Sequence, residues 1–124
     1  MSAPYIAEVQ TAHWTSDAIR DVFKADNFDL HDFPLTQHLE KNLPAGKIFY
    51  STRHSKLFGL QYKTLYGNGR DFWPLDPTQH KTLQRFPWIF YCYSELKHVA
   101  DRSRALPVAR FYRFPQLSPP TCRV

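Results

Sequence analysis

One segment limits the possible folds of this chain more than any other: the run of six apolar and aromatic residues Trp88–Tyr93. An unbroken run of this length is typical of a central strand that is buried on both faces. A strand of this kind needs strands beside it and helices over its faces to exclude water. The sequence therefore predicts a sheet flanked by helices, with Trp88–Tyr93 as a central strand.

Other strands are predicted where apolar and polar residues alternate, which is the period of a strand. From residue 47 onward, Lys47–Ser51 and Lys56–Leu65 follow this pattern, and the polar link 52–55 between them indicates a hairpin. Pro107–Phe114 alternates in the same way and predicts a last strand. Residues 66–70, which include two glycines, are expected to form a turn.

Two segments carry clear helix signals. In Thr15–Ala25 a hydroxyl side chain at position 15 or 16 is the expected cap, and apolar residues then recur at helical spacing. The sequence leaves open whether the preceding residues, 6–14, form an earlier helix. Asp76 followed by Pro77 is a good helix opening, because a capping carboxylate precedes a proline at the first helical position. We expect that helix to run to about Arg85.

A further helix is predicted over Leu35–Leu43. Asp32-Phe33-Pro34 has the character of a helix start, leucines recur every four residues, and Pro44-Ala45-Gly46 ends the pattern. The acidic stretch 26–33 before it is expected to be a turn. The predicted order is helix, helix, hairpin, helix, strand, strand, which defines an α+β fold with a small mixed sheet flanked by helices.

The length of the chain, 124 residues, is that of a single domain. Its hydrophobic fraction of 43% and aromatic fraction of 16% are enough for a packed core, which a disordered chain would lack. We expect residues 1–114 to form one α+β domain. Residues 115–124 contain three prolines and are expected to form an irregular tail.

The compartment is predicted from what the sequence lacks. No apolar run approaches the roughly 20 residues that span a bilayer, and the first residues do not resemble a secretion signal. Two cysteines, Cys92 in the apolar run and Cys122 in the tail, do not suggest a disulfide framework. We therefore expect a soluble cytoplasmic protein without a membrane partner.

Charge is distributed unevenly along the chain, which carries a net +5. Residues 1–46 hold seven acids and three bases, for a net of −4, whereas residues 47–124 hold thirteen bases and four acids, for a net of +9. A basic surface attracts polyanions, of which DNA and RNA are the commonest in cells. The alternative is that the two halves neutralise each other in the folded protein.

Gln61 and Lys63 are the residues best placed for chemistry. They lie two apart on a predicted strand, so their side chains leave on the same face. An amide carbonyl beside an ammonium group is suited to hold a divalent cation and to stabilise the charge that builds up on a phosphate. The alternative is that both residues belong to the solvated face of an amphipathic strand.

Residues 58–64, on the second arm of the hairpin and followed by a helix and a buried strand, carry a family resemblance. They resemble the Gln-x-Lys variant of the core motif of restriction-endonuclease-like (PD-(D/E)xK) nucleases. The likeness in element order covers about residues 35–95, and the tripeptide Gln61-Tyr62-Lys63 is the part that matches residue by residue. It implies a nuclease-like core with Mg²⁺-dependent hydrolysis of DNA or RNA.

The resemblance also implies a set of site residues. Gln61, Lys63 and Glu40 would be catalytic, and Glu40 and Gln61 would hold Mg²⁺. To these we add Arg53, Lys56, Arg70 and Arg110 as the expected contacts to the phosphates of the nucleic acid. The family places an aspartate on the preceding strand, and Lys47–Ser51 contains no acid. The site is therefore either inactive or rebuilt from Glu40, Gln61 and a loop acid such as Asp71.

A function of another class stays open on the same sequence. Exposed aromatic residues and a polarised charge also suit a small protein-binding module or inhibitor of the phage or mobile-element type, which acts on a larger partner. A surface divided between two charges can also drive self-association.

A cluster of acids and histidines around Asp29, His31, Asp32 and His38 has no recognised metal-ligand spacing and is better explained by turn and capping roles.

Overall fold

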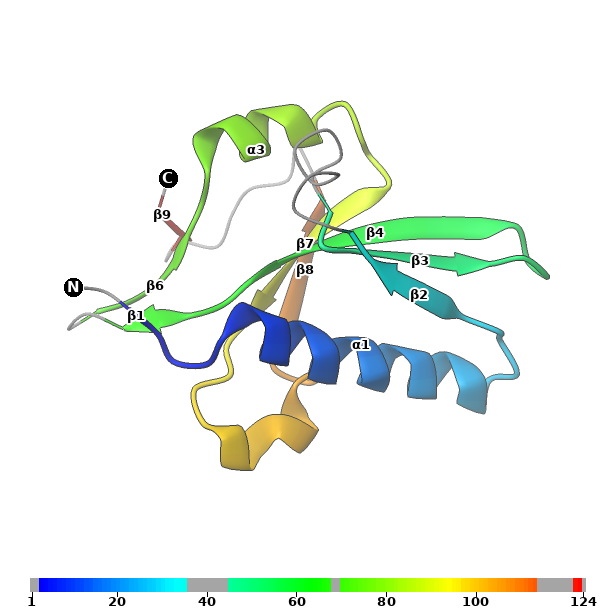
Figure 1. Ribbon diagram of the computed structural model, residues 1–124, viewed down its shortest axis with the longest axis horizontal. Helices are drawn as coiled ribbons and strands as arrows, with labels where there is room; N and C mark the ends of the chain where they lie inside the picture. Colours follow the sequence, from blue (N-terminus) through cyan, green and yellow to red (C-terminus); the bar gives the residue numbers. More distant parts are fainter. Residues whose placement is uncertain (1–2, 36–44, 68–69, 114–121, 124) are drawn as a thin grey trace.

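The computed structural model describes residues 3–35, 45–67, 70–113 and 122–123. They form an α+β fold around a mixed five-stranded sheet whose strands follow the order β2-β3-β4-β7-β8 (Figure 1). Neighbouring strands are antiparallel except β4 and β7, which are parallel. The bounds are β2 (His31–Pro34), β3 (Lys47–Ser51), β4 (Lys56–Lys63), β7 (Ile89–Ser94) and β8 (Ala109–Arg113).

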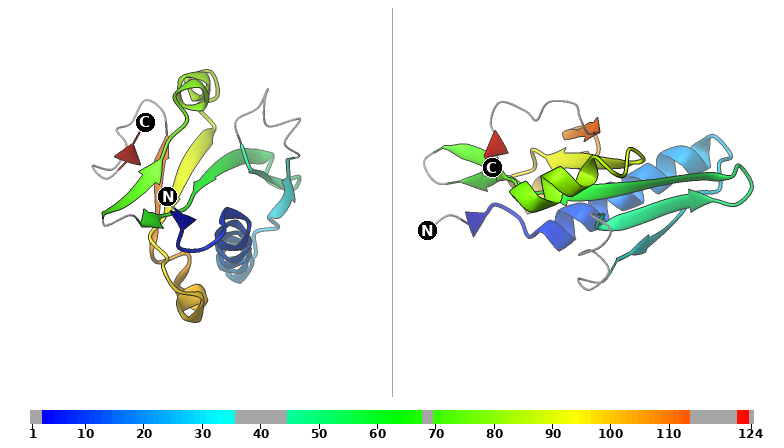
Figure 2. Two further views of the ribbon diagram at one scale, coloured as in Figure 1. Left: turned by 60° about the vertical axis from the view of Figure 1, so that its left-hand side comes forward. Right: turned by 90° about the horizontal axis from the view of Figure 1, so that it is seen from above.

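Among the described residues, three helices accompany this sheet: α1 (Glu8–Ala25), α3 (Pro77–Leu83) and the 3₁₀ helix η1 (Val99–Arg104). Helices α1 and α3 lie on opposite sides of the sheet (Figures 1 and 2). Ala12 and Ile19 of α1 belong to one core cluster with Leu60 of β4, and Leu83 of α3 belongs to another with Ile89 of β7. The sheet is thus the middle of three layers, as the sequence predicts.

Strand β7 (Ile89–Ser94) confirms the expectation of a buried central strand at Trp88–Tyr93. Ile89 and Tyr93 contribute to the core beneath α3, while Cys92 contributes to the core beneath α1. All three side chains are almost completely buried. The predicted hairpin of β3 and β4 and the predicted last strand, β8, are also present.

A second, smaller sheet was not foreseen. Its order is β1-β5-β6-β9, and it lies at the end of the molecule where β4 ends (Figure 1). Its strands are β1 (Ala3–Pro4), β5 (Tyr66–Gly67), β6 (Asp71–Pro74) and β9 (Cys122–Arg123). The prediction of a turn over residues 66–70 was therefore incomplete, since Tyr66 and Gly67 pair with residues of β6.

The predicted irregular tail also needs correction at its end. Cys122 and Arg123 form a strand that pairs in parallel with Trp73 and Pro74. A two-residue strand has no periodicity of its own, and its partner segment lies about fifty residues earlier in the chain. Residues 115–121 lie outside the described residues.

The prediction of a cap at Thr15 or Ser16 is wrong. Helix α1 is continuous from Glu8, with Ala7 at the N-cap position, and Thr15 and Ser16 are buried in its middle. The buried side of α1 is a stripe at helical spacing built largely from small polar residues, so hydropathy did not reveal it. Its members are Thr11, Ala12, Thr15, Ser16 and Ile19.

The prediction of a helix start at Asp32–Pro34 is also wrong. These residues belong to β2, an edge strand whose His31 pairs with Tyr50 and whose Pro34 pairs with Lys47. Proline is acceptable at such an edge because its missing N–H removes no bond from a central strand. The rest of that predicted helix, residues 36–43 with Glu40, lies outside the described residues.

The helix predicted after Asp76 is confirmed. The Asp76 carboxylate accepts hydrogen bonds from the backbone N–H groups of Thr78 (2.9 Å) and Gln79 (3.3 Å), and Pro77 occupies the first turn. The helix ends at Leu83, two residues before the expected end.

Within the described ranges, no helix combines the length and apolar character that crossing a bilayer would require.

Candidate functional site

Two cavities adjoin at Glu8, the first residue of α1, and both are lined by the last residues of β4. The first has a volume of about 290 Å³ and is lined by residues that include Glu8, Val9, Ala12, Lys47 and Gln61. We call it the Gln61 cavity. The second, the Lys63 cavity, has a volume of about 380 Å³. Its lining includes Glu8, Lys63, Thr64, Tyr66 and Asp76.

Gln61 is 5% exposed, which rules out its assignment to a solvated strand face. The physical reason is its place in β4, the middle strand of the five, where β3 and β7 flank it. Its Nε2 donates a long hydrogen bond of 3.4 Å to the carbonyl oxygen of Tyr62. Among the described residues its Oε1 has no hydrogen-bond partner. A buried acceptor left in this state costs about 1–3 kcal/mol.

Lys63 is half-buried at the end of β4. Its ammonium group donates a 2.8 Å hydrogen bond to Oε1 of Gln79 on α3. Two carboxylates, those of Glu8 and Asp76, line the same cavity. The bond to Gln79 holds the ammonium group in a defined direction at the wall of a polar cavity, beside these two acids.

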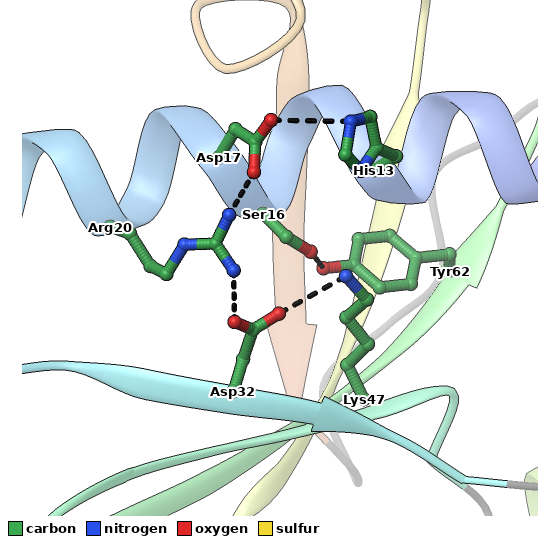
Figure 3. A network of polar contacts seen from close by, with 7 residues as sticks. All are labelled: His13, Ser16, Asp17, Arg20, Asp32, Lys47 and Tyr62. Carbon is green, nitrogen blue, oxygen red and sulfur yellow. Dashed lines mark hydrogen bonds and ion pairs between the residues drawn. The ribbon is translucent and has the colours of Figure 1, made fainter.

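The lysine that lines the Gln61 cavity already has an anionic partner. Lys47 donates a 3.1 Å hydrogen bond to Asp32, whose side chain is 5% exposed and also receives a hydrogen bond from Arg20 (Figure 3). Arg20 in turn pairs with Asp17. Burial alone raises the pKa of Asp32, but the hydrogen bonds from Lys47 and Arg20 outweigh it, and the net pKa is lowered. Here the acidic and basic parts of the chain neutralise each other.

The four predicted phosphate contacts do not gather around Gln61 and Lys63. Arg53 and Lys56 are exposed at the turn between β3 and β4. Because β4 rises about 3.3 Å per residue, Lys56 lies roughly 20 Å from Lys63. Arg70 is exposed beside the smaller sheet, and Arg110 on β8 forms an ion pair with Glu95 at 2.7 Å.

The acids proposed for a rebuilt metal site are placed as follows. Glu40 lies outside the described residues. Asp71 accepts hydrogen bonds from Lys97 (2.5 Å) and from the Tyr5 hydroxyl (2.6 Å), which lower its pKa, and it lines neither cavity. On the neighbouring strand Lys47 pairs with Leu60, so Gly46 comes opposite Gln61 and supplies no carboxylate.

The Mg²⁺ that the family resemblance implies requires hard, anionic oxygen ligands. No group of three or more His, Cys, Asp or Glu residues in the described part of the chain is placed to hold a metal ion. In the Gln61 cavity Glu8 is the one carboxylate among the described lining residues, and the Lys47 ammonium shares that wall. The described residues by themselves do not fit Mg²⁺, and we derive no cleavage step from them.

Glu8 is the residue that sequence reasoning missed. The helix that packs against the sheet begins at Glu8, seven residues earlier than predicted, so its carboxylate reaches the end of β4. An acid in the first turn of a helix is a common stabilising choice, because it suits the positive end of the helix dipole. The sequence therefore carries no signal that separates Glu8 from an ordinary first-turn acid.

An apolar groove of about 400 Å³ lies elsewhere, between α1 and strands β4, β7 and β8. Its walls include Ile19 and Val22 of α1, Leu60 of β4 and Phe111 of β8. Val22 is 52% exposed and Phe111 43% exposed. Phe111 lies on β8, the predicted last strand, and it borders this apolar groove.

No likeness to a known protein explains this arrangement: no family model, no curated protein and no solved structure matches the chain. The polar groups at the end of β4 include the Gln61 amide, the ammonium groups of Lys47 and Lys63, and the carboxylates of Glu8 and Asp76, which line two adjoining cavities. Such a set suits a ligand that combines hydrogen-bond donors with negative charge. A nucleotide unit has both.

Proposed function

We propose that this chain is a nucleic-acid-associated protein with a nuclease-like core, and that it binds a nucleotide unit of DNA or RNA at the end of β4. The observation that carries the proposal is the pair of adjoining cavities. Gln61 lines one, Lys63 lines the other, and Glu8 lines both. Two residues at neighbouring same-face positions of a strand thereby belong to the linings of cavities that share Glu8.

The order of elements supports the nuclease-like core. Strands β3 and β4 form a hairpin, α3 follows after the short strands β5 and β6, and the buried strand β7 lies parallel to β4. Apart from β5 and β6, this succession agrees with the hairpin, helix and buried strand on which the resemblance to restriction-endonuclease-like nucleases rests. The tripeptide that carries the resemblance ends at Lys63, at the polar cavity.

The excess of basic residues after residue 46 supports a polyanionic partner. Several of these residues are exposed, including Arg53, Lys56, Arg70, Lys81 and Arg85. They lie on different elements, so they are suited to general attraction of a charged polymer rather than to contacts at one point. Lys63 is the cation that a bound phosphate would meet inside a cavity.

Replacing Lys63 by methionine is expected to weaken binding of single-stranded oligonucleotides by roughly tenfold and to reduce the slope of log K against log salt by about one. Methionine keeps an apolar stem while the charge is lost. Fluorescence anisotropy across a salt series measures both quantities. Lys24→Met, an exposed lysine of α1 outside both cavities, is the matched control. If Lys63→Met and Lys24→Met behave alike, the cavity does not hold the phosphate.

Hydrolysis of DNA or RNA remains a prediction of the resemblance. If the site is active, wild-type protein with Mg²⁺ or Mn²⁺ will cleave oligonucleotides, and Lys63→Ala, Glu40→Gln and chelation of the metal will each abolish cleavage. Product analysis on single- and double-stranded substrates of both nucleic acids measures this. Absence of cleavage with every metal and substrate removes the enzymatic version and leaves binding.

The second candidate function is protein binding, and the apolar groove between α1 and β8 favours it. Its exposed residues Val22 and Phe111 are of the kinds that interfaces bury. The occupant that the chain itself supplies is a second copy. Sedimentation velocity over a range of concentrations is then expected to show a dimer that Val22→Asp and Phe111→Asp dissociate. A monomer at every concentration contradicts this candidate.

A further inference from the structure

We propose that two copies of this chain associate through strand β8 (Ala109–Arg113), which pairs edge to edge and antiparallel with β8 of the second copy. The two five-stranded sheets then form one continuous sheet. This inference goes beyond nucleic-acid binding and does not depend on it. It gives the second copy named for the apolar groove a defined mode of attachment, through backbone hydrogen bonds.

Strand β8 is an open edge of the larger sheet. The order β2-β3-β4-β7-β8 places β2 and β8 at the two edges, and among the described residues β8 pairs with β7 alone. An unpaired edge presents a row of N–H and C=O groups that another strand can bond, and proline is one of the residues that block such pairing. Strand β2 ends in Pro34, whereas β8 contains no proline.

Two hydrogen bonds show which backbone groups of β8 lie at the open edge. The carbonyl of Val108 accepts a bond of 3.1 Å from the N–H of Glu95, so residue 108 is directed at the segment that continues β7. The N–H of Ala109 donates instead to Leu106 in the preceding turn. Because this direction alternates along an antiparallel pair, residues 110 and 112 bond to β7, and the N–H and C=O of Phe111 point to the open edge.

A second copy suits this edge because it brings the same features to the junction. Antiparallel pairing of two identical strands has a two-fold axis perpendicular to the sheet, so both α1 helices lie on the same side of the joined sheet. The two apolar grooves then meet along the paired β8 strands. Phe111, which is 43% exposed and borders the groove, packs beside the second copy on that side. Opposing residues of paired strands are about 4.5–5.5 Å apart, which is within reach of an aromatic ring.

Charge does not oppose this pairing. Like charges placed opposite each other across two strands are destabilising. Arg110, which is exposed on β8, forms an ion pair with Glu95 at 2.7 Å. Each copy therefore brings one acid and one base from these two positions, and the junction gains no net charge from them.

The inference is tested by sedimentation velocity on Phe111→Pro and Phe111→Ala. Both substitutions remove the ring, but proline also removes the N–H at the open edge, once in each copy. Phe111→Pro is therefore expected to dimerise at least roughly tenfold more weakly than Phe111→Ala. A proline whose N–H would face away from β7 is acceptable in an edge strand, and circular dichroism establishes that both variants are folded. Equal dissociation constants for the two variants would overturn the inference.

Amide hydrogen exchange followed by nuclear magnetic resonance tests the same pairing in the wild type, so it does not require any variant to fold. Protection of the Phe111 amide is expected to rise with protein concentration, while the Tyr112 amide, which bonds to β7, is protected at every concentration. Exchange of the Phe111 amide that is independent of concentration would contradict strand pairing.

The outcomes separate this inference from the other proposals. A dimer that Val22→Asp dissociates and Phe111→Pro leaves intact would overturn strand pairing and keep the apolar groove as an interface. A monomer at every concentration would overturn both strand pairing and the groove as an interface between copies. Oligonucleotide binding is measured separately, so neither result removes the proposed nucleic-acid association.

Discussion

Asp32→Ala is expected to lower the free energy of unfolding by about 3 kcal/mol, because it leaves two partly buried cations without their anion. The Asp32 side chain is 5% exposed and binds both Lys47 and Arg20, which are 17% and 37% exposed. Removing one partner of a buried ion pair typically costs about 3–5 kcal/mol. We place the effect at the lower end, since Arg20 stays partly hydrated and keeps Asp17.

Urea denaturation at neutral pH measures this loss, and Asp26→Ala, an exposed acid just after α1, is the matched control. The triple variant Asp32→Leu, Arg20→Met, Lys47→Met removes all three charges together and is expected to recover most of the loss. A loss for Asp32→Ala no larger than that of Asp26→Ala would show that the network contributes little.

The same carboxylate makes stability depend on pH. Because the folded pKa of Asp32 is lowered, its contribution is fully present above the unfolded value of about 3.9 and is lost as the pH falls through that value towards the folded pKa. Wild-type protein should therefore lose stability on acidification more steeply than Asp32→Asn. Parallel urea titrations at neutral and acid pH test this, and equal slopes would contradict it.

Ile89→Ala is expected to lower the free energy of unfolding by about 3 kcal/mol. Ile89 is fully buried at the start of β7, in the core cluster that includes Leu83 of α3 and Ile48 of β3. Removing three carbons there leaves a cavity that the surrounding strands cannot fill. Ile89→Val, which removes one carbon, is the graded control and should cost about 1 kcal/mol.

The glycine opposite Ile89 makes this prediction sharper. A Cβ atom on Gly59 would lie 3.1 Å from Cγ1 of Ile89 and 3.2 Å from Cβ of Ala45, so a methyl group there is crowded in the wild type. Ile89→Ala removes the nearer contact. Gly59→Ala should therefore be less destabilising in the Ile89→Ala background than alone. A double-mutant cycle with additive energies would show that the two positions are not coupled.

The sequence predicted the three-layer core because its strongest signals are local. Each of these signals identifies one element from that element's own residues. They are the apolar run of β7, the alternation in β3 and β4, and the Asp76-Pro77 opening of α3. The small sheet and strand β2 depend on pairing with distant segments, so periodicity could not reveal them. Helix α1 escaped full recognition because Thr15 and Ser16 are buried by contacts with the sheet, such as the hydrogen bond between Ser16 and Tyr62 (Figure 3).

The site was predicted only in part, for a related reason. Two-residue spacing on a strand predicted that Gln61 and Lys63 act near each other, and both line cavities that adjoin. Burial of Gln61 depends on which strands flank β4, and that is a property of the sheet order. The contribution of Glu8 depends on where α1 begins. Arg53, Lys56 and Arg110 lie away from Gln61 and Lys63 because of the lengths and pairing of the strands. The number of charges in a segment does not predict these positions.

The small sheet has a practical consequence for how this protein is attached to anything else. Strands β1 and β9 bring residues near both chain ends into that sheet, and Pro4, Tyr66 and Pro74 from it form part of the wall of the Lys63 cavity (Figure 1). An affinity tag, a fluorescent fusion or a surface tether at either end would therefore stand close to the cavity under test. A reporter is better placed at the turn between β3 and β4, at the far end of the molecule.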